Sequence, residues 1–221
     1  MYSIAIDGPA GAGKSTIAKR IAKELSFIYV DTGAMYRAMA LYFLRNQISS
    51  EDVEAVSKEC EKIHVTIEYK DGEQQVILNG ENVNGLIRTE EVGNMASKTS
   101  SIPAVRAALL DLQRDMAKTA DILMDGRDIG TNVLPDADLK IYLTASSKVR
   151  AKRRYDELTA KGVECDLDTI EQDIIIRDQQ DMNRDIAPLK QAEDAVLVDS
   201  SEMTIDQVVE TIKGKFSEVC K

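Results

Sequence analysis

Gly8-Pro9-Ala10-Gly11-Ala12-Gly13-Lys14-Ser15 matches the pattern G-x-x-x-x-G-K-[ST] at every fixed position, and this stretch decides the fold. Ser3–Asp7 before it is mostly apolar and predicts a short buried strand. Thr16–Leu25 after it has apolar side chains at helical spacing and predicts an amphipathic helix. Glycines between a strand and a helix let backbone N–H groups turn inward around an anion, and the helix N-terminus adds a favourable dipole. The stretch therefore predicts a phosphate-binding loop for a nucleoside triphosphate.

Two further positions belong to the chemistry of this loop. Lys14 is expected to reach the β- and γ-phosphates, and the Ser15 hydroxyl to ligate Mg²⁺. Asp125 ends the apolar segment Ile122–Asp125, and the carboxyl ends of parallel strands are where ligands bind. Asp125 could support Mg²⁺, directly or through water, or cap the next segment, and the residues leave both open. Arg127, two positions later, is expected beside the phosphates.

Composition narrows the class of protein. The chain has 221 residues, of which 43% are hydrophobic and 30% charged, as expected for a soluble globular protein with a substantial core. Met1–Ile6 is too short for a signal peptide, and no apolar run approaches a membrane span. Cys60, Cys165 and Cys220 are far apart, which favours reduced thiols in a cytoplasmic protein. The single histidine, His64, cannot build a metal cluster and is expected within a strand as a structural or surface residue. We expect a monomer.

The formal net charge of −10 argues against partners such as nucleic acid polymers or anionic membranes. Arginines are nevertheless concentrated locally, which favours small phosphate-bearing ligands. One group is Arg150 to Arg154, which forms either a solvated helix surface or a mobile lid over phosphates. Arg177, Asp181 and Arg184 are spaced to share one helix face, and that face is either a salt-bridged surface or part of a site.

Strand and helix patterns alternate along the chain, which predicts an α/β fold with a parallel sheet flanked by helices. The expected further strands are Phe27–Asp31, Ile122–Asp125, Leu139–Leu143 and Ala195–Asp199. The expected further helices are Ala34–Leu44, Glu51–Lys62, Thr89–Ser97, one from Pro103 that buries Val105, Ala108, Leu109, Leu112 and Met116, Ser147–Lys161, one begun by a capping box at Asp168, and one capped at Thr204 that buries Ile205, Val208, Val209, Ile212 and Phe216. Residues 63–83 alternate apolar and polar side chains between two tight turns and predict an inserted antiparallel meander. This insert is either a packing appendage or one wall of a closing cleft.

Three functions are compatible with a phosphate-binding loop and many arginines. A hydroxyl acceptor would need a carboxylate base, for which Asp31 is the candidate. A phosphate acceptor needs no base, because a phosphate monoester is largely dianionic near neutrality, with a second pKa of about 6. The scarcity of histidine and the spread of arginines over separate segments favour the phosphate acceptor. A nucleotide-dependent switch is the third possibility, and the lack of an N-K-x-D sequence counts against a GTP version.

Four stretches together carry a resemblance to bacterial cytidylate kinases, a family of nucleoside monophosphate kinases. These stretches are Ile4 to Pro9, Asp31-Thr32-Gly33-Ala34-Met35-Tyr36-Arg37, Asp125-Gly126-Arg127-Asp128-Ile129-Gly130-Thr131, and Asp181 to Leu189. The resemblance spans nearly the whole chain and implies one domain, 1–221, with a P-loop kinase core. It also implies a monophosphate-binding region at about 33–118 that includes the β insert 63–83, and a short helical lid at about 147–166. The implied activity is transfer of the γ-phosphoryl group of ATP to CMP or dCMP, with Mg²⁺, in pyrimidine nucleotide metabolism.

The resemblance also implies residue roles. ATP phosphates would bind Gly8, Pro9, Ala10, Gly11, Ala12, Gly13, Lys14, Ser15 and Thr16, and the lid arginines would be Arg150, Arg153 and Arg154. The acceptor phosphate would meet Arg37, Arg127 and Arg184. The cytosine edge would be read by Ser97, Arg106 and Asp128 with Thr32 nearby, and the sugar would be held by Arg177 and Asp181. Lys14, Arg127 and the lid arginines would be the catalytic groups. Thr32 stands where some members have serine, and both residues supply a hydroxyl.

Overall fold

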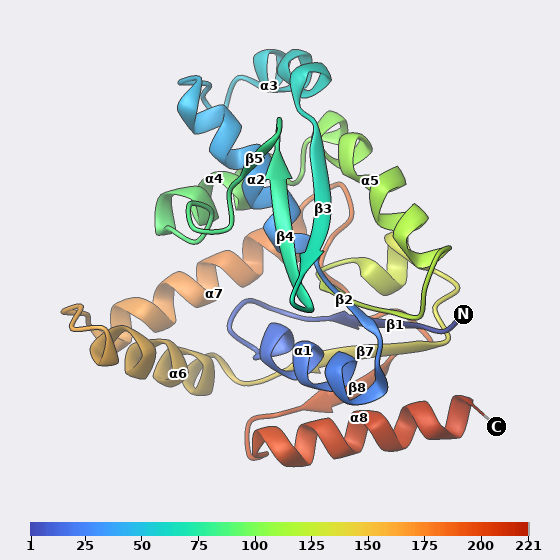
Figure 1. Cartoon of the computed structure of the whole chain (residues 1–221). Helices are drawn as coiled ribbons and strands as arrows, with labels where there is room; N and C mark the ends of the chain where they lie inside the picture. The colour runs from blue at the N-terminus through green and yellow to red at the C-terminus, as the bar shows by residue number, and fades with distance from the viewer. Residues whose placement is uncertain (221) are drawn as a thin grey trace. The chain divides into compact units, whose positions relative to one another are not determined.

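The structure is a computed structural model that describes residues 1–220 (Figure 1). The chain forms two compact units. The phosphate-loop unit comprises residues 2–29 and the chain from residue 121 onward, and the insert unit comprises Met1 and Val30–Ala120.

The phosphate-loop unit is built on the predicted parallel sheet. The strands are β1 (Ser3–Asp7), β2 (Ile28–Asp31), β6 (Ile122–Gly126), β7 (Leu139–Thr144) and β8 (Val196–Asp199), and their order is β2-β6-β1-β7-β8. The last two residues of β2 are counted with the insert unit. β1 pairs in parallel with β6 on one side and β7 on the other. In this register Asp7, the last residue of β1, lies opposite Gly126. The residues that come after Asp7 and Gly126 therefore leave the sheet at the same edge, where open parallel sheets bind ligands.

Two helices pack on this sheet through apolar faces. α1 (Lys14–Leu25) and α8 (Ile205–Val219) pack together, and their buried residues join one core with the strands. That core includes Ile4 and Ile6 of β1, Ile17 and Ile21 of α1, and Val209, Ile212 and Phe216 of α8. α6 (Ser147–Ala160) and α7 (Leu167–Asn183) pack against each other, as Figure 1 shows. A single π-turn, η2 (Ile129–Val133), follows β6.

Three local predictions in this unit were wrong. α7 is capped by Asp166, whose Oδ1 accepts from Thr169 N at 2.8 Å, whereas Asp168 lies in the first turn. Ile205 is exposed because it precedes the buried stripe of α8, although the capping box of Thr204 is present as predicted. Arg184 does not share a helix face with Arg177 and Asp181, because α7 ends before Arg184 and the backbone of Arg184 is extended.

The insert unit contains the predicted meander. Its helices are α2 (Thr32–Arg45), α3 (Val53–Glu59) with the 3₁₀ turn η1 (Cys60–Lys62), α4 (Glu90–Thr99) and α5 (Pro103–Ala117). Its strands β3 (Val65–Lys70), β4 (Glu73–Leu78) and β5 (Glu81–Asn82) form an antiparallel sheet in that order. Both connecting turns have two residues with positive φ, Asp71-Gly72 and Asn79-Gly80, as tight hairpins require. His64 lies just before β3 and is exposed, so its predicted place inside a strand was wrong.

α5 buries a different face from the predicted one. Val105 and Leu109 are buried as expected, but Ala108 is exposed, while Arg106 and Gln113 are buried. Gln113 donates from Nε2 to the sulfur of Met35 on α2 at 3.9 Å. Apolar periodicity cannot reveal a buried amide, which is why the predicted face was misplaced. Within residues 1–220, no helix has both the length and the apolar character that a membrane span needs.

Candidate active site

The phosphate-binding loop has the backbone that an anion site requires. A Cβ on Gly8 would lie 1.9 Å from the carbonyl oxygen of Leu143, so only glycine fits where the loop leaves β1. Gly13 is the N-cap residue of α1, with φ 88°, and no side chain caps the helix there. The first N–H groups of α1 are therefore available to a bound anion, where the helix dipole favours negative charge.

Lys14 lies inside this loop. Its side chain is buried, and Nζ donates a hydrogen bond to the carbonyl oxygen of Pro9 at 2.8 Å. Burial, together with the positive charge of Arg127, lowers the pKa of Lys14 to about 7 against the opposing effect of nearby carboxylates. A phosphate bound at the loop would add negative charge beside Lys14 and favour its charged ammonium form.

Asp125 lies next to Ser15. The Ser15 hydroxyl donates to Asp125 Oδ2 at 2.9 Å, and the Tyr29 hydroxyl donates to Oδ1 at 2.8 Å. The alternative role of Asp125 was to cap the next segment, but the residue at the N-cap of η2 is Asp128. A hydroxyl and a carboxylate side by side are the hard oxygen ligands that Mg²⁺ accepts together with phosphate oxygens. In residues 1–220 there is no group of three or more His, Cys, Asp or Glu side chains placed to hold a metal ion.

Asp7 is a buried carboxylate that was not predicted from the sequence. Its Oδ1 accepts from Ile129 N at 2.8 Å, and its Oδ2 accepts from Gly130 N at 2.7 Å. Burial raises the pKa of Asp7 to about 6 in spite of these two bonds. The carboxylate thereby ties the residue before the phosphate loop to the segment that comes after Arg127. An acidic residue at the end of an apolar strand was the only sequence signal.

Four of the predicted acceptor-site residues lie together in the phosphate-loop unit. Arg127 Nε donates to Asp181 Oδ2 at 3.0 Å. Arg184 lies 3.8 Å from Asp128 Oδ1 and 4.0 Å from Asp181 Oδ1, and its Nε donates to the carbonyl oxygen of Ala187 at 2.6 Å. Asp128 and Asp181 are buried and Arg127 is half-buried, so these charges are held in defined positions.

The remaining residue predicted for the acceptor site in this unit, Arg177, is half-buried on α7, one turn before Asp181.

The three lid arginines do not act as one group. Arg150 is buried, pairs with Asp178, and donates from NH1 to the carbonyl oxygen of Ala10 in the phosphate loop at 3.0 Å. Arg153 donates to the carbonyl oxygen of Ser200 at 2.9 Å. Its NH1 would lie 3.9 Å from a Cβ placed on Gly13, which puts it close to the loop.

Arg154 instead forms an exposed pair with Glu157 at 3.1 Å.

Asp31 organises the predicted residues at the start of α2 in the insert unit. It is the N-cap residue, and its Oδ1 accepts from Ala34 N at 2.8 Å. Its Oδ2 accepts from Arg37 at 3.0 Å and from Arg88 at 3.2 Å. Burial alone would raise the pKa of Asp31, but the charges of Arg37 and Arg88 outweigh burial and lower it. Arg88 was not predicted, because its segment has no pattern that points toward Asp31.

Arg37 and Thr32 both belong to the first turns of α2. Thr32 opens the helix and is buried. The Nε of Arg37 is buried and has no hydrogen-bond partner among residues 1–220. A buried donor without a partner costs free energy, and the oxygen of a bound anion would satisfy it.

Ser97 and Arg106 lie on neighbouring helices of the same unit. Ser97 is half-buried near the end of α4. Arg106 of α5 is buried, donates to the carbonyl oxygen of Ser100 at 3.3 Å, and lies over the ring of Tyr36 on α2 at 5.7 Å. The predicted base-reading arginine is therefore held by contacts to α2 and to the end of α4.

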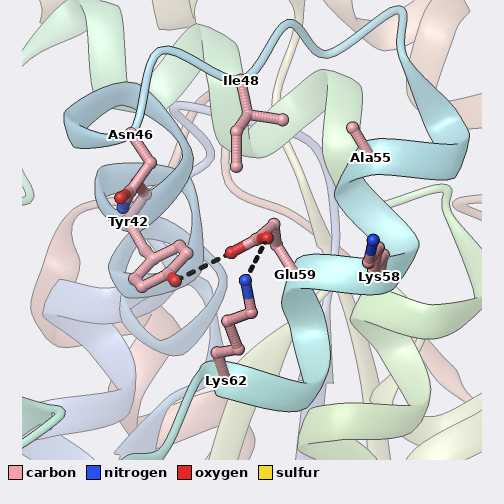
Figure 2. A pocket seen from close by; sticks show the side chains of 7 residues that line it. All are labelled: Tyr42, Asn46, Ile48, Ala55, Lys58, Glu59 and Lys62. Carbon is pink, nitrogen blue, oxygen red and sulfur yellow. Dashed lines mark hydrogen bonds and ion pairs between the residues drawn. The ribbon is translucent and has the colours of Figure 1, made fainter.

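A hollow of about 480 Å³ in the insert unit contains none of the predicted site residues (Figure 2). It is lined by Tyr42, Asn46, Ile48, Ala55, Lys58, Glu59 and Lys62. Tyr42 and Lys62 donate to the Glu59 carboxylate at 3.0 Å and 2.5 Å, so each oxygen of this carboxylate already accepts a hydrogen bond.

Comparison with known proteins identifies the family. The family model described as cytidylate kinase matches residues 4–218. The chain belongs to the cytidylate kinase family. A cytidylate kinase of Alkaliphilus metalliredigens is 51% identical over 97% of this chain and 96% of its own length. A cytidylate kinase of Caldicellulosiruptor saccharolyticus is 48% identical over 98% and 96%. The resemblance inferred from the four sequence stretches is confirmed.

Solved structures agree on the fold. An uncharacterized protein from Eubacterium ventriosum aligns with a TM-score of 0.55 at 12% identity, covering 98% of this chain and 99% of its own. A shikimate kinase from Acinetobacter baumannii, solved with shikimate, aligns with a TM-score of 0.50 at 15% identity, covering 99% and 94%. At this level of identity the likeness supports the predicted α/β fold alone.

Proposed function

We propose that the protein transfers the γ-phosphoryl group of ATP to CMP and dCMP and forms CDP and dCDP by in-line displacement. Membership of the cytidylate kinase family makes it a phosphotransferase. The observation that supports a phosphate acceptor over a hydroxyl acceptor is the state of Asp31. Its carboxylate caps α2 and holds Arg37 and Arg88, and these charges lower its pKa. A carboxylate so engaged is a poor general base, whereas a phosphate acceptor needs none.

The donor phosphates are proposed to bind along Gly8 to Thr16. The uncapped N-terminus of α1 and the buried ammonium group of Lys14 support this assignment. Lys14, Arg150 and Arg153 would stabilise the negative charge on the transferring group, since preorganised donors are worth most in a water-poor site. Arg154 would first have to leave Glu157, and an exposed pair of that kind costs little to break.

Magnesium is proposed to be held through Ser15 and Asp125, whose oxygens lie 2.9 Å apart. When bound, it would neutralise charge on the ATP phosphates. The protein's own contribution is to fix these two side chains, which the hydrogen bond from Tyr29 to the other Asp125 oxygen supports.

The acceptor is proposed to bind the residues that the family resemblance implies. Arg37, Arg127 and Arg184 would bind its phosphate, and the buried Nε of Arg37 supports this assignment. Ser97, Arg106 and Asp128, with Thr32, would read the cytosine edge, since a carboxylate can accept from the N4 amine and an arginine can satisfy the ring acceptors. Arg177 and Asp181 would hold the sugar, and Asp181 would also position Arg127 through their 3.0 Å bond.

The test is a coupled assay of ADP release with ATP, Mg²⁺ and a panel of acceptors: CMP, dCMP, UMP, shikimate and gluconate. Turnover that depends on CMP or dCMP supports the proposal, and turnover on shikimate or gluconate supports the hydroxyl-acceptor alternative. Tight nucleotide binding without acceptor-stimulated turnover would instead indicate a switch. We further propose that the enzyme is cytoplasmic and that it is a monomer. Sedimentation equilibrium of the purified protein would test whether it is a monomer.

A further inference from the structure

One side chain of the insert grips the backbone at the start of α2. The amide of Gln74, on β4, accepts from Asp31 N with Oε1 at 2.7 Å and donates from Nε2 to Asp31 O at 3.2 Å. Both groups belong to the same residue, so the two bonds form a closed ring. A primary amide can make such a ring because it carries an acceptor and a donor side by side. Two bonds fix the orientation of the gripped peptide groups as well as their position.

Gln74 is itself held in place. It pairs with Tyr69 of β3, and its backbone carbonyl oxygen accepts from Asn84 Nδ2 at 2.8 Å. The other end of the Asn84 amide, Oδ1, accepts from Val76 N at 2.8 Å. Since β5 pairs only with the far end of β4, the Asn84 side chain continues the hydrogen bonding of that edge down to Gln74. We call the Gln74 side chain with its two bonds to Asp31 the clamp. The clamp is therefore anchored in the inserted sheet.

The gripped residue positions the first turn of α2. Asp31 is the N-cap of this helix, and the next residue is Thr32. The Asp31 carboxylate holds Arg37, whose guanidinium runs back along the first turn, because a Cβ on Gly33 would lie 3.0 Å from Arg37 NH1. A shift of the Asp31 backbone would move the cap, the hydroxyl of Thr32 and the carboxylate that aims Arg37.

We propose that Gln74 is a positioning residue for acceptor binding, and that the inserted sheet serves the reaction by clamping the start of α2. This role rests on the proposed function, in which Thr32 and Arg37 contact the nucleoside monophosphate. It gives the insert a task within its own unit, and neither of the two roles considered for the insert from sequence includes that task.

Kinetics of two variants and a matched control test the clamp. Gln74→Met keeps the length of the side chain and removes both hydrogen bonds, and Gln74→Ala also removes the packing. Gln75→Ala is the control, because it removes a neighbouring amide that bonds to Asn82 and Asn84 but leaves in place both bonds of Gln74 to Asp31 and the bond of Asn84 to the Gln74 backbone. Both Gln74 variants should raise KM for CMP about tenfold, the scale of losing one or two neutral hydrogen bonds. KM for ATP, kcat and the values for Gln75→Ala should stay near wild type.

The outcomes separate the clamp from a structural role and from the proposed function. A wild-type KM for CMP in Gln74→Met would overturn the clamp, as would an equal rise in KM for CMP and KM for ATP. Hydrogen exchange of the Asp31 amide in the ligand-free protein gives a readout without turnover. Exchange should be faster in Gln74→Met than in wild type, and equal rates would also overturn the clamp. Absence of CMP-dependent turnover in wild type overturns the proposed function, and with it the role of Gln74 in acceptor binding.

Discussion

Asp31→Asn separates the two acceptor chemistries, because the substitution is nearly isosteric and keeps the N-cap. Asparagine caps helices as well as aspartate does, so the bond from Ala34 N should survive. The ion pairs with Arg37 and Arg88 are lost, because the uncharged Nδ2 donor takes the place of the Oδ2 that accepts from both arginines. The pair with Arg37 joins side chains only 9% and 23% exposed, and losing a charge-assisted bond of this kind costs about 2–3 kcal/mol. The pair with Arg88, whose side chain is 62% exposed, adds less than about 1 kcal/mol.

We expect the free energy of unfolding to fall by about 3 kcal/mol, measured by urea denaturation. We expect kcat with CMP to change little, while KM for CMP rises because Arg37 loses its anchor. A general base would behave differently, since its removal costs roughly a hundredfold to ten-thousandfold in rate. A folded Asp31→Asn protein that loses kcat on that scale would refute the reasoning.

The pH dependence of stability gives a second check on Asp31. The folded state lowers the pKa of this carboxyl, so its stabilising effect is present above its unfolded pKa of about 3.9 and is lost as pH falls through the lowered folded value. The difference in unfolding free energy between wild type and Asp31→Asn should therefore be constant from neutral to mildly acidic pH. It should shrink only below about pH 4. A difference that disappears near neutral pH would contradict the lowered pKa.

Three further substitutions address the donor loop and base selection. Lys14→Ala should lower kcat/KM at least about a hundredfold, the scale of one lost transition-state donor, and near-normal turnover in the coupled assay would remove Lys14 from its role. Asp128→Ala should reduce the ratio of kcat/KM for CMP over UMP, and an unchanged ratio would show that the base is read elsewhere. Gly8→Ala should destabilise the fold by at least about 3 kcal/mol in urea, because its Cβ would lie 1.9 Å from Leu143 O. Gly72→Ala is its control, since Gly72 also has positive φ but nothing within 4 Å, and a similar loss in both variants would argue against the clash.

Local pattern was sufficient for most of the fold. The succession of strands and helices along the chain is predicted by short apolar runs and caps, and the meander by two turns that each need positive φ. The capping-box pattern at Asp168 predicted the start of α7 two residues too late. The structure uses Asp166 because Thr169 bonds to it through both N–H and hydroxyl.

The candidate site was predictable where its residues follow one another in a single sequence motif. The phosphate loop, Lys14 and Ser15 are of this kind. Two partners that hold the site were not predictable, because they lie far away in the chain from the residues they bond. Asp7 bonds residues more than a hundred positions later, and Gln74 reaches back to Asp31. Such contacts have no signature in periodicity, since they depend on how elements pack.

The arginines of the candidate site already have carboxylate partners: Arg37 has Asp31, Arg127 has Asp181 and Arg150 has Asp178. These carboxylates hold the guanidinium groups in place and offset part of the positive charge that a dissolved phosphate ion would meet. We expect free phosphate to inhibit the protein poorly, and tight binding to need a ligand whose base and ribose make further contacts. Pairing these three guanidinium groups with internal carboxylates thus limits the binding of the commonest wrong anion while the arginines keep their positions.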